Sequence, residues 1–495
     1  MAYSKKPMRR SALIGPWGVG AIVPFPNDES LMIAGLDMWR YSSTDSFIIK
    51  DDRLQKRLGV KELRWPPDFR DRNVDPKNCN LTIPAVRFPR WHYCPFCGGM
   101  QKVGFFTKQP VCDAYPWEHG RKCNPKAKFK RKLIPERFVV VCPDGHIDDF
   151  PVAEWVHFDS GHTYDPSTCR IRRSTGGTSA ALTGVRYECT CGASKTIANA
   201  VRLGALKRIG YSCKGTKPWL GIEEDKENPC TCDASEIKVL QRGASNVWFA
   251  DTRSSIHIPT DTESASRQII AAVNSCYKTV AKYRVNGDID KDIVAIFADN
   301  YGVDKDELYD AIVIKIKNME SLPEVSESMT EDEYRLAEYK MLIKSSGSDS
   351  MDFHSINFSI DDYHPVIRKY FSSISLVKKL RETRAFVGFS RLQPSATNDL
   401  KKQKRMLRLG NGDWLPAIEV YGEGIFFEFN QQLLSEWASR PGVIRRVSML
   451  NNAFQNSNFS KLSPGNLRPE FILLHTFSHL IINQLSYECG YGSSA

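Results

Sequence analysis

The sequence predicts an α+β multidomain protein built around zinc-ribbon-like, cysteine-rich modules. Eleven of its 14 cysteines lie between Cys94 and Cys232, and several form C-x-x-C or C-x-C pairs, the spacing typical of tetrahedral zinc sites. After this region the pattern becomes helical, and the last part alternates strand-like and helix-like stretches. A length of 495 residues allows about three domains with separate cores.

Changes in pattern divide the chain into five regions. Short apolar stretches broken by glycine, proline and asparagine predict strands and turns at the start. Strand-like runs such as residues 137–141 accompany the cysteines. The predicted regions are 1–90 (β-rich), 91–150 (zinc-ribbon-like), 151–260 (second cysteine-rich zinc module), 261–345 (helical) and 350–495 (mixed α/β).

The helical region carries two N-terminal signals. Asp304 with Glu307, and Thr330 with Glu333, have the spacing of capping boxes. Apolar residues then recur at helical spacing after each box, and a Ser/Gly linker at residues 345–348 ends the region.

The last region predicts two strands, a short helix and a long helix. Residues 417–420 and 425–429 have strand patterns, and the glycine-rich residues 422–424 between them predict a turn. Residues 431–439 have a helical pattern. Residues 470–487 are apolar around most of a helix, which predicts a buried helix.

The first predicted zinc site begins with Cys94-Pro-Phe-Cys97-Gly98, the C-P-x-C-G form of a zinc knuckle. Cys112 and Cys123 are the favoured second half, with an inserted loop between them. Cys142 and His146 form a competing second half.

The second predicted site takes Cys189, Cys191, Cys213 and Cys230, with Cys232 as the alternative to Cys230 and Cys169 as a spare ligand. All-thiolate sites are closed, so both predicted zinc ions are structural rather than catalytic. Cys79 and Cys276 are interpreted as small buried hydrophobic residues.

Basic side chains are concentrated in two clusters within a net charge of +11. Such clusters attract nucleic-acid phosphates, although a solvated loop is the alternative interpretation. The first cluster spans residues 121–132 without an acid, and the second faces only Asp399. The predicted nucleic-acid-binding residues are Lys126, Lys128, Lys130, Arg131, Lys132, Lys401, Lys402, Lys404 and Arg405.

Signatures of several enzyme classes are missing from the sequence. It has no G-x-x-x-x-G-K-[ST] for ATP, no G-x-S-x-G nucleophile elbow and no zinc-deaminase motif. His475 and His479 are spaced as in zinc peptidases, but Thr476 stands where the glutamate base belongs, so we interpret them as core histidines. The chain is therefore predicted not to be an enzyme.

The cellular compartment is predicted from the absence of signal-peptide and membrane-span patterns in the sequence. It opens without a signal-peptide pattern, and no apolar run reaches the roughly 18 residues of a membrane span. We expect a cytoplasmic protein, in which reduced thiols favour zinc over disulfides.

Nine segments, in order along nearly the whole chain, carry a resemblance to a known family: residues 10–22, 137–151, 242–249, 254–259, 380–382, 388–391, 414–419, 422–426 and 474–491. Together they resemble the DrmB family, the helicase-associated component of DISARM anti-phage defence systems. The resemblance implies a non-catalytic partner of the DISARM helicase DrmA, which would supply ATP hydrolysis and engage DNA. Zinc modules would then be scaffolding, and the basic clusters would extend the DNA path.

The end of the chain departs from this family. Similar proteins continue past the segment that matches residues 488–491 with further cysteines, so the resemblance implies an incomplete C-terminal domain. The alternative function is a free-standing, zinc-dependent nucleic-acid-binding protein. A metal-dependent hydrolase that uses His475 and His479 is a third hypothesis.

Overall fold

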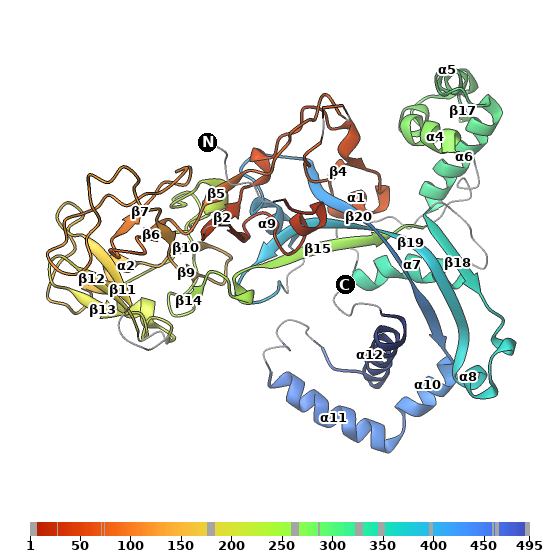
Figure 1. Cartoon of the computed structure of the whole chain (residues 1–495). Coiled ribbons are helices and arrows are strands. Elements are labelled where there is room, and N and C mark those ends of the chain that lie inside the picture. The colour runs from red at the N-terminus through yellow and green to blue at the C-terminus, as the bar shows by residue number, and fades with distance from the viewer. Residues whose placement is uncertain are drawn as a thin grey trace. The chain divides into compact units, whose positions relative to one another are not determined.

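The structure is a computed structural model, shown in Figure 1. It describes residues 7–490 except for 27, 71, 74, 176–183, 259–266, 286–287, 322–329, 345–351, 396–398, 458–459 and 461–464. Helices and several small sheets confirm the predicted α+β class. The chain forms two compact units: unit 1 comprises Met1–Lys50, Val60–Arg253 and Arg384–Ile418, and unit 2 comprises Asp51–Gly59, Ser254–Thr383 and Glu419–Ala495.

The first 90 residues contain short strands, turns and the helix α1. Strand β2 pairs in antiparallel fashion with β1 and with β5, and β4 pairs with β3 and, in parallel, with the start of β20. The elements are β1 (Ile22–Phe25), β2 (Glu29–Ile33), β3 (Ile48–Ile49), α1 (Asp52–Leu58), β4 (Glu62–Arg64) and β5 (Ala85–Arg87).

The cysteine-rich part of unit 1 contains three small antiparallel sheets, ordered β7-β6-β8, β10-β9-β14 and β11-β12-β13. A shared core that includes Phe138, Phe150, Trp155 and Tyr187 fills the space beside the cysteines. The elements are β6 (Trp91–Tyr93), β7 (Met100–Lys102), β8 (Ile134–Pro135), β9 (Phe138–Val141), β10 (Ile147–Asp149), α2 (Val152–His157), β11 (Ile171–Thr175), β12 (Val185–Cys189), β13 (Ser194–Thr196), α3 (Ala205–Arg208) and β14 (Lys238–Gln241).

A buried arginine ties distant parts of unit 1 together. The Arg391 guanidinium donates hydrogen bonds to the carbonyls of Gly145 (2.9 Å), Val247 (2.8 Å) and Gly20 (2.9 Å). Its side chain also lies against the rings of Trp219 and Phe389. Burial lowers the pKa of Arg391 to about 9, which still leaves it a cation at neutral pH.

The region predicted to be helical contains helices α4 to α7, which lie in unit 2. Helices α4, α5 and α6 share an apolar core that contains the buried Cys276, as its interpretation as a hydrophobic residue required. Thr330 and Glu333 form a reciprocal capping box, and Asp304 accepts from the Glu307 amide. The linker at 345–348 lies outside the described residues. The helices are α4 (Arg267–Val280), α5 (Lys291–Tyr301), α6 (Lys305–Ser321) and α7 (Glu331–Lys344), and β16 (Arg284–Val285) pairs with β17 (Asp288–Ile289).

Long strands dominate the rest of the chain, and the largest sheet has the order β15-β19-β20-β4-β3, with β18 paired to β19. Strands β15, β19 and β20 each supply residues to both units. The remaining elements are β15 (Phe249–Ile256), β18 (Phe353–Asn357), α8 (Pro365–Tyr370), β19 (Phe371–Ser390), α9 (Leu400–Arg405), β20 (Trp414–Phe429), α10 (Gln431–Ala438), α11 (Pro441–Gln455) and α12 (Pro469–Cys489).

The predicted turn at residues 422–424 is wrong. Strand β20 runs unbroken through Gly422 and Gly424. Neither glycine adopts the left-handed φ that would reverse the chain, so both act as extended residues. The helix predicted after it is confirmed as α10.

The predicted burial of the last helix is also wrong, although the helix itself exists. Phe477 of α12 contacts Phe371, Phe427 and Phe429. Side chains such as Leu480 and Tyr487 are exposed, and α12 has no buried residue among those described. The described part of unit 2 covers this helix only in part.

Candidate metal centres

Three groups of four cysteine and histidine side chains lie in unit 1, each with its ligand atoms within 4.8 Å of one another. All 14 cysteines are free of disulfides. The first cluster is Cys94, Cys97, Cys112 and Cys123; the second is Cys142, His146, Cys213 and Cys230; the third is His157, Cys169, Cys189 and Cys191.

The first cluster combines the Cys94–Cys97 knuckle with Cys112 and Cys123 from the segment that follows it. Cys94 and Cys97 sit in the tight turn after β6, where the Gly98 amide donates to the Cys94 carbonyl (2.9 Å). Gly98 has φ +77°, and a Cβ there would lie 2.3 Å from the Arg173 carbonyl oxygen, so glycine is required. The Cys112 amide donates to the Arg131 carbonyl (2.8 Å), and this hydrogen bond fixes the backbone of Cys112, which belongs to the second pair of ligands.

The sulfur positions in the first cluster suit a tetrahedral zinc ion. Cys94 Sγ lies 3.6 Å from Cys123 Sγ, and Cys97 Sγ lies 3.7 Å from Cys112 Sγ. Zinc–sulfur bonds of about 2.3 Å in a tetrahedron separate neighbouring sulfurs by about 3.8 Å. The structure therefore brings together the four cysteines predicted for the first site, in a geometry that fits the metal.

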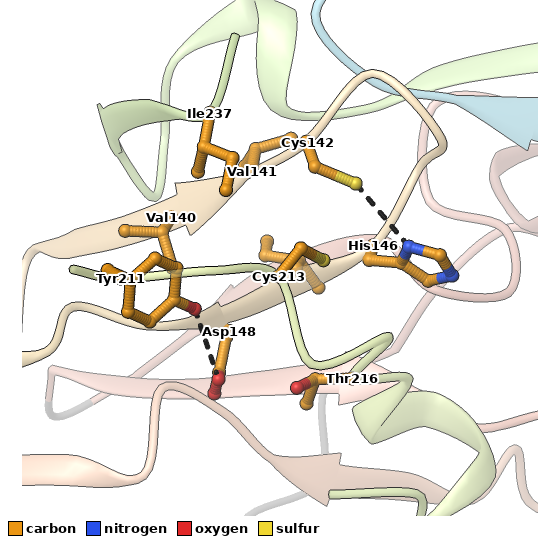
Figure 2. A pocket seen from close by; sticks show the side chains of 10 residues that line it. Val140, Val141, Cys142, His146, Asp148, Tyr211, Cys213, Thr216 and Ile237 are labelled. Carbon is orange, nitrogen blue, oxygen red and sulfur yellow. Dashed lines mark hydrogen bonds between the residues drawn. The ribbon is translucent and has the colours of Figure 1, made fainter. Parts of the chain in front are cut away.

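The second cluster lies at the hairpin between β9 and β10. Cys142 Sγ is 3.4 Å from His146 Nδ1 and 3.8 Å from Cys230 Sγ. Figure 2 shows Cys142, His146 and Cys213 around a small pocket, where the Tyr211 hydroxyl donates to Asp148 (3.4 Å). The donors Cys142, Cys213, Cys230 and His146 form a sulfur and nitrogen set of the kind that binds structural zinc.

An acidic residue and a lysine flank the second cluster. Asp144 Oδ2 lies 3.4 Å from Cys230 Sγ, and Lys402 Nζ of α9 lies 3.2 Å from Asp144 Oδ1. Burial alone would raise the pKa of Asp144, but the hydrogen bond from Lys402 and other contacts hold it below its ordinary value. Asp144 thus stays ionised, and its ion pair with Lys402 connects α9 to the Cys142–His146 hairpin.

The third cluster contains the most clearly oriented ligand. His157 ends α2, and its Nδ1 donates to the Ala153 carbonyl one turn earlier (2.7 Å). This bond fixes the tautomer and leaves Nε2 free, 3.3 Å from Cys191 Sγ and 3.8 Å from Cys169 Sγ. Metal-ligating histidines are commonly held in this way, which supports a metal-binding role for His157.

The grouping of the remaining ligands differs from the predicted second site. The structure divides the predicted set, because Cys189 and Cys191 join the third cluster whereas Cys213 and Cys230 join the second. Cys142 and His146, predicted as an alternative for the first site, belong to the second cluster, and the spare Cys169 belongs to the third. The sequence predicted two zinc sites, whereas the described residues form three clusters that could each hold a metal ion.

Sequence reasoning missed His157 altogether. It lies 12 residues before Cys169 and 34 before Cys191, so no knuckle spacing marks it. Cys232, the predicted alternative, lies beside the second cluster, where burial and then contact with Cys230 raise its pKa.

All three clusters supply four protein ligands each, and most of those ligands are buried. A site with four protein ligands leaves no open position for a catalytic water, so these clusters fit structural rather than catalytic zinc. When bound, the metal would cross-link chain segments that share only small sheets.

The histidines of α12 are not core residues, and that prediction was wrong. His475 and His479 are both exposed, with ring centroids 4.6 Å apart. Thr476 donates its hydroxyl to the Ile472 carbonyl (2.8 Å), so it offers no base beside them.

The two basic clusters have different surroundings. All seven basic residues at 121–132 are exposed, and none forms an ion pair within the described part of the chain. In the second cluster Lys402 pairs with Asp144, Lys404 is half-buried, and Lys401 and Arg405 are exposed on α9. The basic residues at 121–132 therefore form a cationic surface without ion-pair partners among the described residues, unlike Lys402 of α9.

Fold and site together define a multidomain α+β protein with closed, zinc-type cysteine modules. Residues 9–249, which include all three clusters, match a family described only as a domain of unknown function, DUF8724. Over 493 aligned residues the chain is 28% identical to the DISARM protein DrmB of Bacillus paralicheniformis, covering 94% of this chain and 79% of that protein. The predicted resemblance to DrmB is confirmed. Among the described residues, no helix has the length and apolarity to cross a membrane.

Proposed function

We propose that this chain is a non-catalytic, zinc-stabilised component of a DISARM anti-phage defence system, which acts in the cytoplasm with the helicase DrmA and helps it to engage DNA. The observation that carries the proposal is the similarity to DrmB along 94% of the chain. A likeness of this extent includes the region of the clusters and the long-stranded unit 2.

The metal clusters support a scaffolding role. Their ligand sets are complete without water or substrate, and they join chain segments of small three-stranded sheets. The division of labour with a helicase agrees with the missing P-loop motif, because DrmA would supply ATP hydrolysis.

The exposed basic residues at 121–132 support contact with DNA. Unpaired lysine and arginine side chains release counterions when they meet phosphates, which favours binding without sequence preference. Lys401 and Arg405 would add to the same kind of surface on α9.

Co-expression with DrmA tests this function. We expect the two chains to co-elute and the DNA-stimulated ATPase rate of the helicase to rise, while the chain alone hydrolyses no ATP. The triple variant Lys126→Gln/Lys128→Gln/Lys130→Gln should keep the helicase bound but weaken the stimulation by DNA. Failure of the wild-type chain to bind DrmA would contradict the proposal.

A second candidate is a free-standing nucleic-acid-binding protein, which the unpaired basic loop favours. It predicts that the isolated chain binds DNA with a steep salt dependence. Since each lost phosphate contact lowers the slope of log K against log salt by about 0.7–0.9, the triple variant should lower it by about 2–3. An unchanged slope would count against this candidate.

A further inference from the structure

An aromatic side chain stands exposed at the bend of the basic loop, residues 121–132. Phe129 is 82% exposed, and the Lys128 ammonium lies 5.8 Å from its ring centroid. A single exposed apolar side chain is ordinary, but Phe129 lies among seven cations and no acid, and an aromatic ring among cations is the arrangement that binds unpaired nucleic-acid bases.

The basic loop is held in place by the first metal cluster, which consists of Cys94, Cys97, Cys112 and Cys123. Cys123, one of the four ligands, lies near its start, and its end is pinned where Val111 bridges Lys132 and the Cys112 amide bonds the Arg131 carbonyl. Arg121 and Arg131 lie over the ring of Phe96, 5.6 and 4.3 Å from its centroid. Phe96 lies within the Cys94–Cys97 knuckle, so the knuckle helps to position the guanidinium groups of Arg121 and Arg131.

We propose that the basic loop binds single-stranded DNA, with Phe129 stacked on an unpaired base and the neighbouring lysines on phosphates. Cationic side chains interleaved with exposed aromatic rings are the usual way to hold single strands, because every base offers a π face. In a duplex the bases are already stacked, so the ring gains no partner there. The choice of DNA rests on the proposed function.

Binding measurements with the 495-residue chain, loaded with zinc, test this inference. We expect the chain to bind a fluorescent oligo-dT more tightly than a blunt duplex of equal length. Phe129→Ala should weaken single-strand binding about tenfold, as expected for the loss of one stacked base. It should leave duplex binding unchanged, and Phe129→Trp should retain single-strand affinity.

Phe69→Ala is the matched control, since Phe69 is also exposed (64%) but lies between Asp68 and Arg70 rather than in the basic loop. It should bind as the wild type does. Zinc content and melting temperature, measured for each variant, show whether Phe129→Ala is folded.

Three results would overturn the inference. One is equal binding of single strand and duplex with no effect of Phe129→Ala. Another is tighter, Phe129-dependent binding to RNA of the same sequence. The third is Phe129-dependent binding to phosphatidylserine vesicles without binding to the oligonucleotide. If DrmA does not co-elute but Phe129-dependent single-strand binding persists, the DISARM role fails and this inference stands.

Discussion

Removal of zinc by a strong chelator should unfold the cysteine-rich part of unit 1. Structural zinc contributes about 10–16 kcal/mol per site in small zinc modules, which is comparable to the total stability of a whole domain, about 5–15 kcal/mol. The small sheets that carry the ligands have at most three strands, so the metal ions would add to the shared apolar core that packs beside the cysteines.

Limited proteolysis and circular dichroism provide the measurement. After chelation we expect rapid cleavage within residues 91–240, while the helical core of α4, α5 and α6 stays protected because it contains no ligand of the three clusters. Added Zn²⁺ should restore protection. A metal-free chain with unchanged protease resistance would show that the clusters do not hold the fold.

Replacement of the buried Arg391 should have the second large effect. Arg391→Met keeps an unbranched apolar stem but leaves the carbonyls of Gly20, Gly145 and Val247 without this donor. Buried acceptors that lose their partners cost about 1–3 kcal/mol each, and the losses are not fully additive, so we expect about 3–5 kcal/mol of destabilisation.

Chemical denaturation of the zinc-loaded chain checks this prediction. Arg202→Met is the control because Arg202 is an exposed arginine of the same unit, and it should change stability by less than about 0.5 kcal/mol. Because Gly145 lies within the Cys142–His146 hairpin, Arg391→Met should also weaken zinc retention in the second cluster. Equal stability of the two variants would refute the role of Arg391 as a clamp.

The sequence predicted what depends on local chemistry. The Cys94–Cys97 knuckle was recognisable because a tight turn with proline and glycine is written in adjacent residues. The capping box of Thr330 and Glu333 was recognisable for the same reason. Their counterparts in the structure have the expected hydrogen bonds.

What the sequence could not predict depends on contacts between distant segments. A C-x-C pair can join any other pair of ligands, so Cys189 and Cys191 carried no sign that His157 would meet them. The glycines of β20 suit a turn or an extended strand equally well, and only pairing with β19 decides between these. The apolar pattern of α12 showed a helix but not how much of it the neighbouring elements cover.

Native mass spectrometry, with elemental analysis, tests the central claim that three closed zinc clusters form the scaffold. We predict three zinc ions per chain in the wild type and two in His157→Asn, while Cys79→Ser, outside the clusters, keeps three. Two zinc ions in the wild type, or no loss in His157→Asn, would contradict the assignment of the third cluster, and a folded chain without zinc would contradict the account as a whole.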